Sequence, residues 1–173
     1  MDELAVSDTG PPLHLTRIRQ EAHLALFRMV TITGQVEEEL AARKALDAVV
    51  AALPGRLRVE AVSPSEIDAT RRSLQRFKLH EPDLSVAALA ASTRPDLVLT
   101  DDLELRKALE ARGHLVVGSV GILVRAFKEA RLSRAGLEAA LDALLDGSGL
   151  YLSKAFRLHV SKLLGNLSPL PLP

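Results

Sequence analysis

The feature that most constrains this chain is a regular alternation of short aliphatic runs with longer segments of helical spacing. The runs are rich in Leu, Val and Ile and stop at Gly, Pro, Thr, Ser or Asp, as strands do; they occupy residues 4–6, 29–32, 57–62, 97–99 and 114–117. Strands that alternate with helices require right-handed crossovers between parallel neighbours. The sequence therefore predicts an α/β fold, a mainly parallel sheet with helices on both faces.

The segments between and after these runs repeat apolar residues every three to four positions, which predicts amphipathic helices. Thr33 and Ser63 are expected to cap two of them, because Ser and Thr side chains accept hydrogen bonds from free amides in the first turn. The expected helices cover residues 11–26, 35–53, 64–77, 82–92, 103–112, 119–128, 133–145 and 152–164.

The length of 173 residues suits one domain with one core. We expect a single domain over residues 1–165, with a core at about 4–124 and a C-terminal helical extension at about 125–165. Residues 166–173, which contain three prolines, are expected to be a flexible tail. The apolar helices between Leu137 and Leu164 are expected to cover a homodimer or partner surface.

Composition excludes several classes of protein. There are no cysteines, which excludes disulfide frameworks and Cys-based metal sites and fits the cytoplasm. The longest uncharged apolar stretch, Leu115 to Val124, is half of the roughly 20 residues that cross a bilayer, and the acidic start lacks the basic region of a secretion signal. We therefore expect no membrane association.

Acidic residues follow two of the predicted strands and begin two of the predicted helices. Asp8 follows the first strand, Asp101 and Asp102 follow the fourth, and Glu39 and Asp83 lie early in helices. Each alone also fits a helix cap or a solvated residue. Together at one sheet edge they would raise one another's pKa unless a cation neutralised them, and oxygen ligands favour Mg²⁺ or Mn²⁺. Such an ion activates water against a phosphodiester.

Two pairs of residues are candidates for substrate binding beside these acids. Thr9 and Thr100 each adjoin an Asp and are expected to bind phosphate, to orient a carboxylate or to bond the local backbone. Arg72 and Arg76 belong to a cluster of four cations at residues 71–78. Because the net charge is zero, contact with nucleic acid would need such a local patch, although a solvated helix face is the equal alternative.

Four motifs, in order, resemble the acidic motifs of the PIN-domain family. They are Val6-Ser-Asp8-Thr-Gly-Pro, Val36-x-x-Glu39-Leu, Asp83 with Ala88-Leu-Ala90, and Leu97-Val-Leu-Thr-Asp101-Asp102. The similarity runs from about Leu4 to Val124, and the tail around Gly149-Leu-Tyr-Leu-Ser153 is similar to a branch of uncharacterised prokaryotic PIN proteins.

The resemblance implies a Mg²⁺- or Mn²⁺-dependent endoribonuclease that hydrolyses phosphodiester bonds of single-stranded RNA, often as the VapC-like toxin that pairs with an antitoxin protein. It implies that Asp8, Glu39, Asp83 and Asp101 are the catalytic and metal-binding acids, with Asp102 as an alternative or partner for Asp101. The competing hypothesis is a non-catalytic PIN-fold module that binds nucleic acid or serves assembly.

Overall fold

Five short parallel strands form the single sheet of this computed structural model, which describes residues 3–147. The order across the sheet is β3-β2-β1-β4-β5, and the predicted α/β class is confirmed. The strands are β1 (Leu4–Ser7), β2 (Met29–Thr33), β3 (Leu57–Glu60), β4 (Leu97–Leu99) and β5 (Val116–Val117). Chain order reverses between β1 and β4, and in open parallel sheets the crevice beyond the carboxyl ends at such a point is the usual ligand site.

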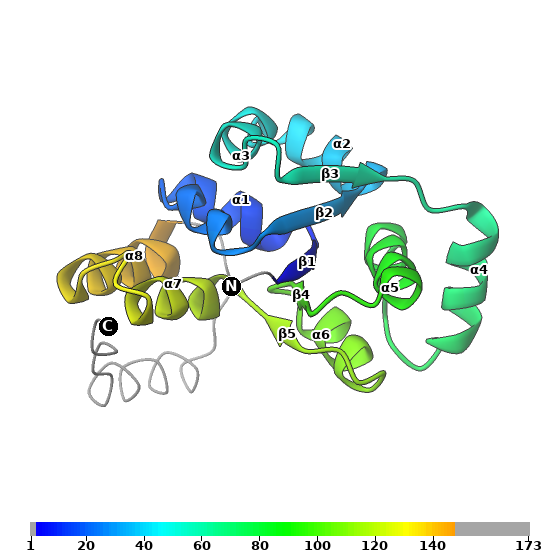
Figure 1. Ribbon diagram of the computed structural model, residues 1–173. Coiled ribbons are helices and arrows are strands. Elements are labelled where there is room, and N and C mark those ends of the chain that lie inside the picture. The colour runs from blue at the N-terminus through cyan, green and yellow to red at the C-terminus, as the bar shows by residue number, and fades with distance from the viewer. Residues whose placement is uncertain (1–2, 148–173) are drawn as a thin grey trace.

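Helices cover both faces of the sheet. Figure 1 shows α1, α7 and α8 on one side and α5, α6 and α4 on the other. Residues 84–90 of α5 are all buried, because this helix packs against the sheet, α4 and α6 together. The helices are α1 (Gly10–Arg17), the 3-10 helix η1 (Glu21–Leu26), α2 (Gly34–Ala42), α3 (Leu46–Ala52), α4 (Pro64–Ser73), α5 (Glu81–Thr93), α6 (Leu103–Glu110), α7 (Ser119–Lys128) and α8 (Arg134–Gly147).

Two helices that were predicted to be continuous are each broken into two pieces in the structure. The segment 11–26 breaks after α1, where Arg19 has a positive φ of 57°, and 35–53 breaks between α2 and α3, where Lys44 has a φ of 58°. Both pieces of each segment bury apolar residues in the same core, so the helical spacing continues across the break. The left-handed residue that ends a helix is commonly Gly or Asn, so Arg and Lys gave no signal for it.

The two predicted caps are present. The Thr33 hydroxyl accepts a hydrogen bond from the Val36 amide, and Ser63 forms a reciprocal capping box with Glu66 at the start of α4. Smaller differences are that α4 ends at Ser73 rather than at residue 77 and that β5 has only two residues.

Some predictions concern the C-terminal part of the chain or its division into domains. The helix predicted at 152–164 and the tail at 166–173 lie outside the described residues, and the single-domain division stays a prediction. Within residues 3–147, no helix is both long and apolar enough to span a bilayer.

Candidate active site

The carboxyl ends of β1 and β4 bring the first acid and a threonine together. Ser7 and Leu99 are paired in the sheet, so the residues that follow them, Asp8 and Thr100, emerge side by side. The Asp8 amide donates to the Leu99 carbonyl at 2.9 Å, and the Thr100 hydroxyl donates to Asp8 Oδ2 at 3.0 Å. The strand register thus fixes the position of the Asp8 carboxylate.

Asp8 is a buried acid, with 8% of its surface exposed. Its pKa is raised to about 6, mainly by burial and in smaller part by the negative charge of Asp83, while hydrogen bonds from the Thr9 amide and the Thr100 hydroxyl oppose the rise. The Thr9 amide donates to Asp8 Oδ1 at 2.6 Å. At neutral pH the carboxylate is therefore ionised against a considerable desolvation cost, which a bound cation would offset.

Asp83 and Glu39 lie in the same electrostatic field. Asp83 is in the first turn of α5, where it accepts a hydrogen bond from the His80 amide at 2.7 Å. Burial is the main cause that raises the pKa of Asp83, and the negative charges of Asp102 and Glu39 raise it further. Glu39, on α2, accepts a hydrogen bond from the Thr9 hydroxyl at 2.5 Å. The helices α2 and α5 thus bring Glu39 and Asp83 near Asp8, since Thr9 bonds both Asp8 and Glu39 and the charge of Asp83 acts on Asp8.

Asp101 and Asp102 have different surroundings although they are adjacent. Asp101 Oδ2 lies 2.8 Å from His14 Nδ1 and 2.5 Å from the Ser119 hydroxyl, which donates to it. Asp101 Oδ1 accepts from the Ser119 amide at 2.8 Å. The carboxylate of Asp101 is therefore engaged by α1 and α7, and it links both helices to the end of β4.

Asp102 is exposed and caps α6, since its Oδ1 accepts from the Leu105 amide at 2.7 Å. This cap uses one carboxylate oxygen. Because Asp102 is also one of the charges that raise the pKa of Asp83, its position favours Asp102 over Asp101 as the fourth acid of the cluster. We call Asp8, Glu39, Asp83 and Asp102 the acidic cluster.

The two threonines predicted beside the acids are both buried. Thr9 donates its hydroxyl to Glu39, and Thr100 donates its hydroxyl to Asp8 while accepting from the Asp102 amide at 3.0 Å. Of the three roles expected for them, the structure favours the orientation of carboxylates.

The structure does not bring Arg72 and Arg76 to the acidic cluster. Both are exposed; Arg72 belongs to α4, which lies on the far side of α5 from the sheet (Figure 1), and the Arg76 guanidinium stacks over the Phe77 ring at 4.8 Å. Neighbouring Arg71 forms ion pairs with Asp68 and Glu81.

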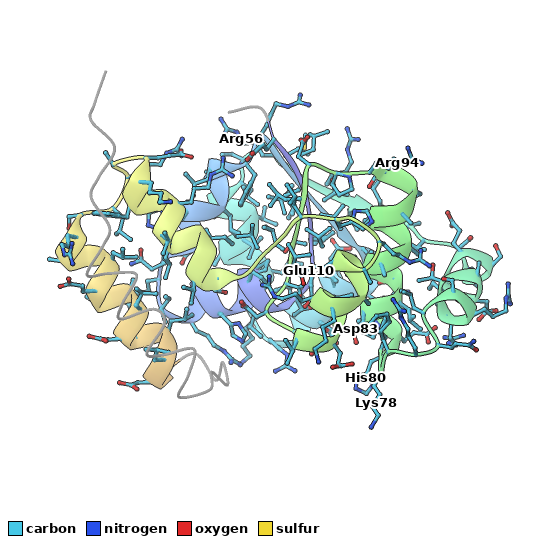
Figure 2. The ribbon with its side chains drawn as sticks, turned by 90° about the horizontal axis from the view of Figure 1, so that it is seen from below. Arg56, Lys78, His80, Asp83, Arg94 and Glu110 are labelled. Carbon is cyan, nitrogen blue, oxygen red and sulfur yellow. The ribbon has the colours of Figure 1, made fainter. Side chains whose placement is uncertain are left out.

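Sequence reasoning missed His80 as a residue of this edge. Figure 2 shows His80 beside Asp83, and the side chains of Lys78 and His80 are both exposed. The available signal was the position of His80 three residues before Asp83, at the start of a helix, since such pairs form reciprocal caps. His80 is therefore an ionisable residue in contact with an acid of the cluster, and Lys78 lies two residues before it in the chain.

The acidic cluster suits a hard divalent ion by its donor chemistry, since all its side-chain ligands are carboxylate oxygens. Residues 3–147 contain no group of three or more His, Asp or Glu side chains already gathered as a metal site. Mg²⁺ typically uses one or two carboxylates and keeps several waters. The suitability of the acidic cluster for such an ion therefore rests on its oxygen donors and on the repulsion between its carboxylates.

A comparison with protein families agrees with the predicted family. The family model DUF3368, described as a PIN domain, matches residues 4–166. One similar solved structure is VapC20 of Mycobacterium tuberculosis, described as a toxin that cleaves the sarcin-ricin loop. It is 20% identical, with a TM-score of 0.47, and the match covers 60% of this chain and 94% of that chain. No curated protein matches the chain.

Proposed function

The chain belongs to the PIN-domain family, whose model spans residues 4–166, and on this premise we propose that it is a divalent-metal-dependent endoribonuclease acting on single-stranded RNA. The observation that carries the proposal is the buried carboxylate of Asp8, whose pKa is raised by burial and by Asp83 at the carboxyl edge of the sheet. A buried, ionised acid beside other acids lowers the stability of the fold, and such acids are typical of functional sites.

In this proposal the acidic cluster of Asp8, Glu39, Asp83 and Asp102 holds Mg²⁺ or Mn²⁺. The ion would supply an activated water and stabilise charge on the leaving oxygen of the phosphodiester. The protein's own contribution is orientation, because Thr9 and Thr100 hold Glu39 and Asp8 by hydrogen bonds.

Asp101, which the family resemblance made a metal-binding acid, becomes a positioning residue in this proposal. Its carboxylate accepts hydrogen bonds from Ser119 and pairs with His14. Through these contacts it holds the β4–α6 junction, and with it Asp102, against α1 and α7.

The substrate would be held mainly through its phosphates. The chain has four Phe, one Tyr and no Trp, which are few for base stacking. His80 lies beside Asp83 (Figure 2) and would contact a phosphate near the acids, with Lys78, Arg72 and Arg76 contacting RNA farther along the chain.

A toxin role with a protein antitoxin, a homodimer and a cytoplasmic location complete the proposal. The family resemblance supports the toxin role, and the lack of cysteines fits a reducing compartment. Co-expression with a small protein encoded beside this gene tests whether that protein is the antitoxin. An antitoxin should suppress the activity and co-purify with the chain.

Metal-dependent cleavage of a labelled single-stranded RNA tests the activity. The parent should cut with Mn²⁺ and not with EDTA, and Asp8→Asn should lose cutting and Mn²⁺ binding while staying folded. Glu38→Gln is the matched control, because Glu38 is exposed on the same helix as Glu39 and its change removes the same charge. Asp102→Asn should lose Mn²⁺ affinity, whereas Asp101→Asn should keep more of it.

The absence of a pre-gathered group of three acids among the described residues favours one alternative, a non-catalytic PIN-fold module that binds RNA. A parent protein that binds RNA but neither binds Mn²⁺ nor cuts would establish that alternative. Equal loss of cutting in Glu38→Gln and Asp8→Asn would refute the role of the acidic cluster.

A further inference from the structure

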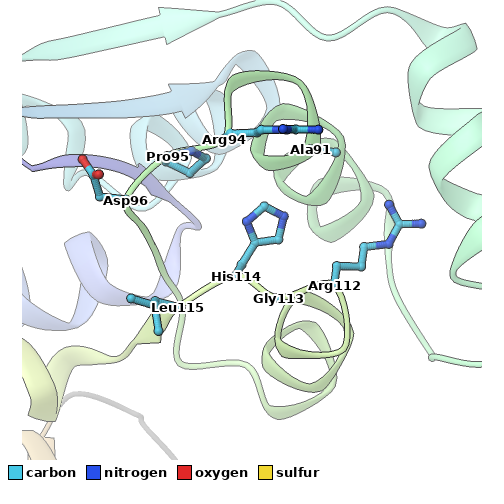
Figure 3. Close-up of a pocket in the computed structure, with 8 residues that line it drawn as sticks. All are labelled: Ala91, Arg94, Pro95, Asp96, Arg112, Gly113, His114 and Leu115. Carbon is cyan, nitrogen blue, oxygen red and sulfur yellow. The ribbon is translucent and has the colours of Figure 1, made fainter.

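A polar hollow lies at the edge of the sheet opposite the acidic cluster. It has a volume of about 620 Å³ and lies where α5 and α6 end and where β4 and β5 begin (Figure 3). The three residues of β4 and Thr100 separate Asp96, in the lining of the hollow, from Asp101. The hollow is therefore not part of the candidate active site, and any ligand it takes is independent of the nuclease proposal.

Three cationic or potentially cationic side chains line this hollow: Arg94, Arg112 and His114 (Figure 3). The Arg94 guanidinium forms no hydrogen bond or ion pair within residues 3–147, whereas the Arg94 backbone amide donates to the Ala90 carbonyl. Arg112 donates to the Ser73 hydroxyl, and in the same part of the chain it has no carboxylate partner. The one acid of the lining, Asp96, accepts a hydrogen bond from the Leu4 amide at 2.7 Å.

Arg112 is close enough to His114 for its charge to affect the imidazole. Burial lowers the pKa of His114, and the positive charge of Arg112 lowers it further. His114 is thus held toward its neutral form, which still supplies one N–H donor. The hollow therefore gathers two guanidinium groups and an imidazole, and no described carboxylate pairs with either guanidinium.

The conformation of Arg94 alone does not explain this arrangement. Arg94 follows α5 with a positive φ of 46°, but Arg19 and Lys44 adopt the same conformation after α1 and α2, and basic residues are favourable at helix C-termini. What distinguishes Arg94 is its convergence with a second arginine, from the end of another helix, on one hollow.

We propose that this hollow binds a phosphate group, with Arg94 and Arg112 as its charged donors and His114 as a further hydrogen-bond donor. The planar guanidinium fork matches phosphate oxygens in pairs, which makes Arg the preferred residue for such recognition. The phosphate belongs either to the backbone of an RNA or to a small phosphorylated molecule, and both would present the same group to the hollow.

The test is a titration with inorganic phosphate in EDTA, followed by the NMR signals of the Gly113 amide and the His114 ring. Arg94→Gly and Arg112→Gln should each weaken phosphate binding about tenfold or more, as expected for loss of a charged hydrogen bond. Gly adopts the left-handed backbone without strain, so Arg94→Gly should melt no lower than the parent. Arg19→Gly is the matched control, since it removes the same charge at the same backbone conformation outside the hollow, and its affinity should be unchanged.

A second titration adds a 2′-O-methyl single-stranded oligoribonucleotide to the phosphate-bound protein. Displacement of phosphate from the hollow identifies an RNA backbone as its source, and no displacement identifies a small phosphorylated molecule. Absence of any shift at Gly113 and His114 in tens of millimolar phosphate, or equal weakening in Arg19→Gly, overturns the proposal. Asp8→Asn should keep phosphate binding, so failure of the nuclease proposal would be seen separately.

Discussion

Replacing Asp8 by Asn should make the metal-free protein more stable at neutral pH. The carboxylate is buried, and its pKa of about 6 in the folded state lies above the ordinary value of 3.8. The folded state therefore binds more protons than the unfolded state between these two values, and the free energy of unfolding falls as pH rises through that window. Asn is neutral at every pH and escapes this loss.

The magnitude follows from the size of the shift. A rise from 3.8 to about 6 corresponds to about 3 kcal/mol of lost stability above the folded pKa, at about 1.4 kcal/mol per unit. About 2 kcal/mol of that loss falls between roughly pH 4.5 and pH 7.5. The amide can accept the Thr9 hydrogen bond with its oxygen and must face Thr100 with its nitrogen, which subtracts about 1 kcal/mol from the gain.

Urea unfolding of both proteins in EDTA at these two pH values gives the measurement. The difference in free energy of unfolding between Asp8→Asn and the parent should grow by about 2 kcal/mol toward the higher pH. Adding Mn²⁺ at neutral pH should then stabilise the parent and not Asp8→Asn, since ligand binding to the folded state raises its stability. A difference that stays constant with pH would refute the buried, destabilising charge on which the metal-site argument depends.

Three further changes test separate parts of the structure. Thr100→Val should raise the pKa of Asp8 further, because it removes a hydrogen bond that lowers it, and NMR titration of the carboxyl carbon would detect the shift. Gly118→Ala should lower the melting temperature, because its Cβ would lie 2.6 Å from Asp101 Oδ1; a variant as stable as the parent would contradict the close packing of Gly118 against Asp101. Ser63→Ala should cost about 1 kcal/mol in urea unfolding through loss of the capping box of α4, with unchanged RNA cleavage.

Local chemistry in the sequence was sufficient for much of the fold. All five strands were located from their aliphatic runs, and Thr33 and Ser63 were identified as caps because a cap bonds an amide only three residues away. The parallel order then placed Asp8 and Asp101 at one edge, since each follows the carboxyl end of a strand. These features depend on neighbours in the chain, and such neighbours are visible in the sequence.

The division of roles within the site depended on tertiary structure. Asp101 and Asp102 are indistinguishable by motif, yet one carboxylate is held by His14 and Ser119, 87 and 18 residues away, while the other raises the pKa of Asp83. The backbone direction at the end of β4 decides which carboxylate faces which partner, and that direction is set by how α1 and α7 pack there. Spacing along the chain carries no record of this packing, so only the folded structure could separate the two acids.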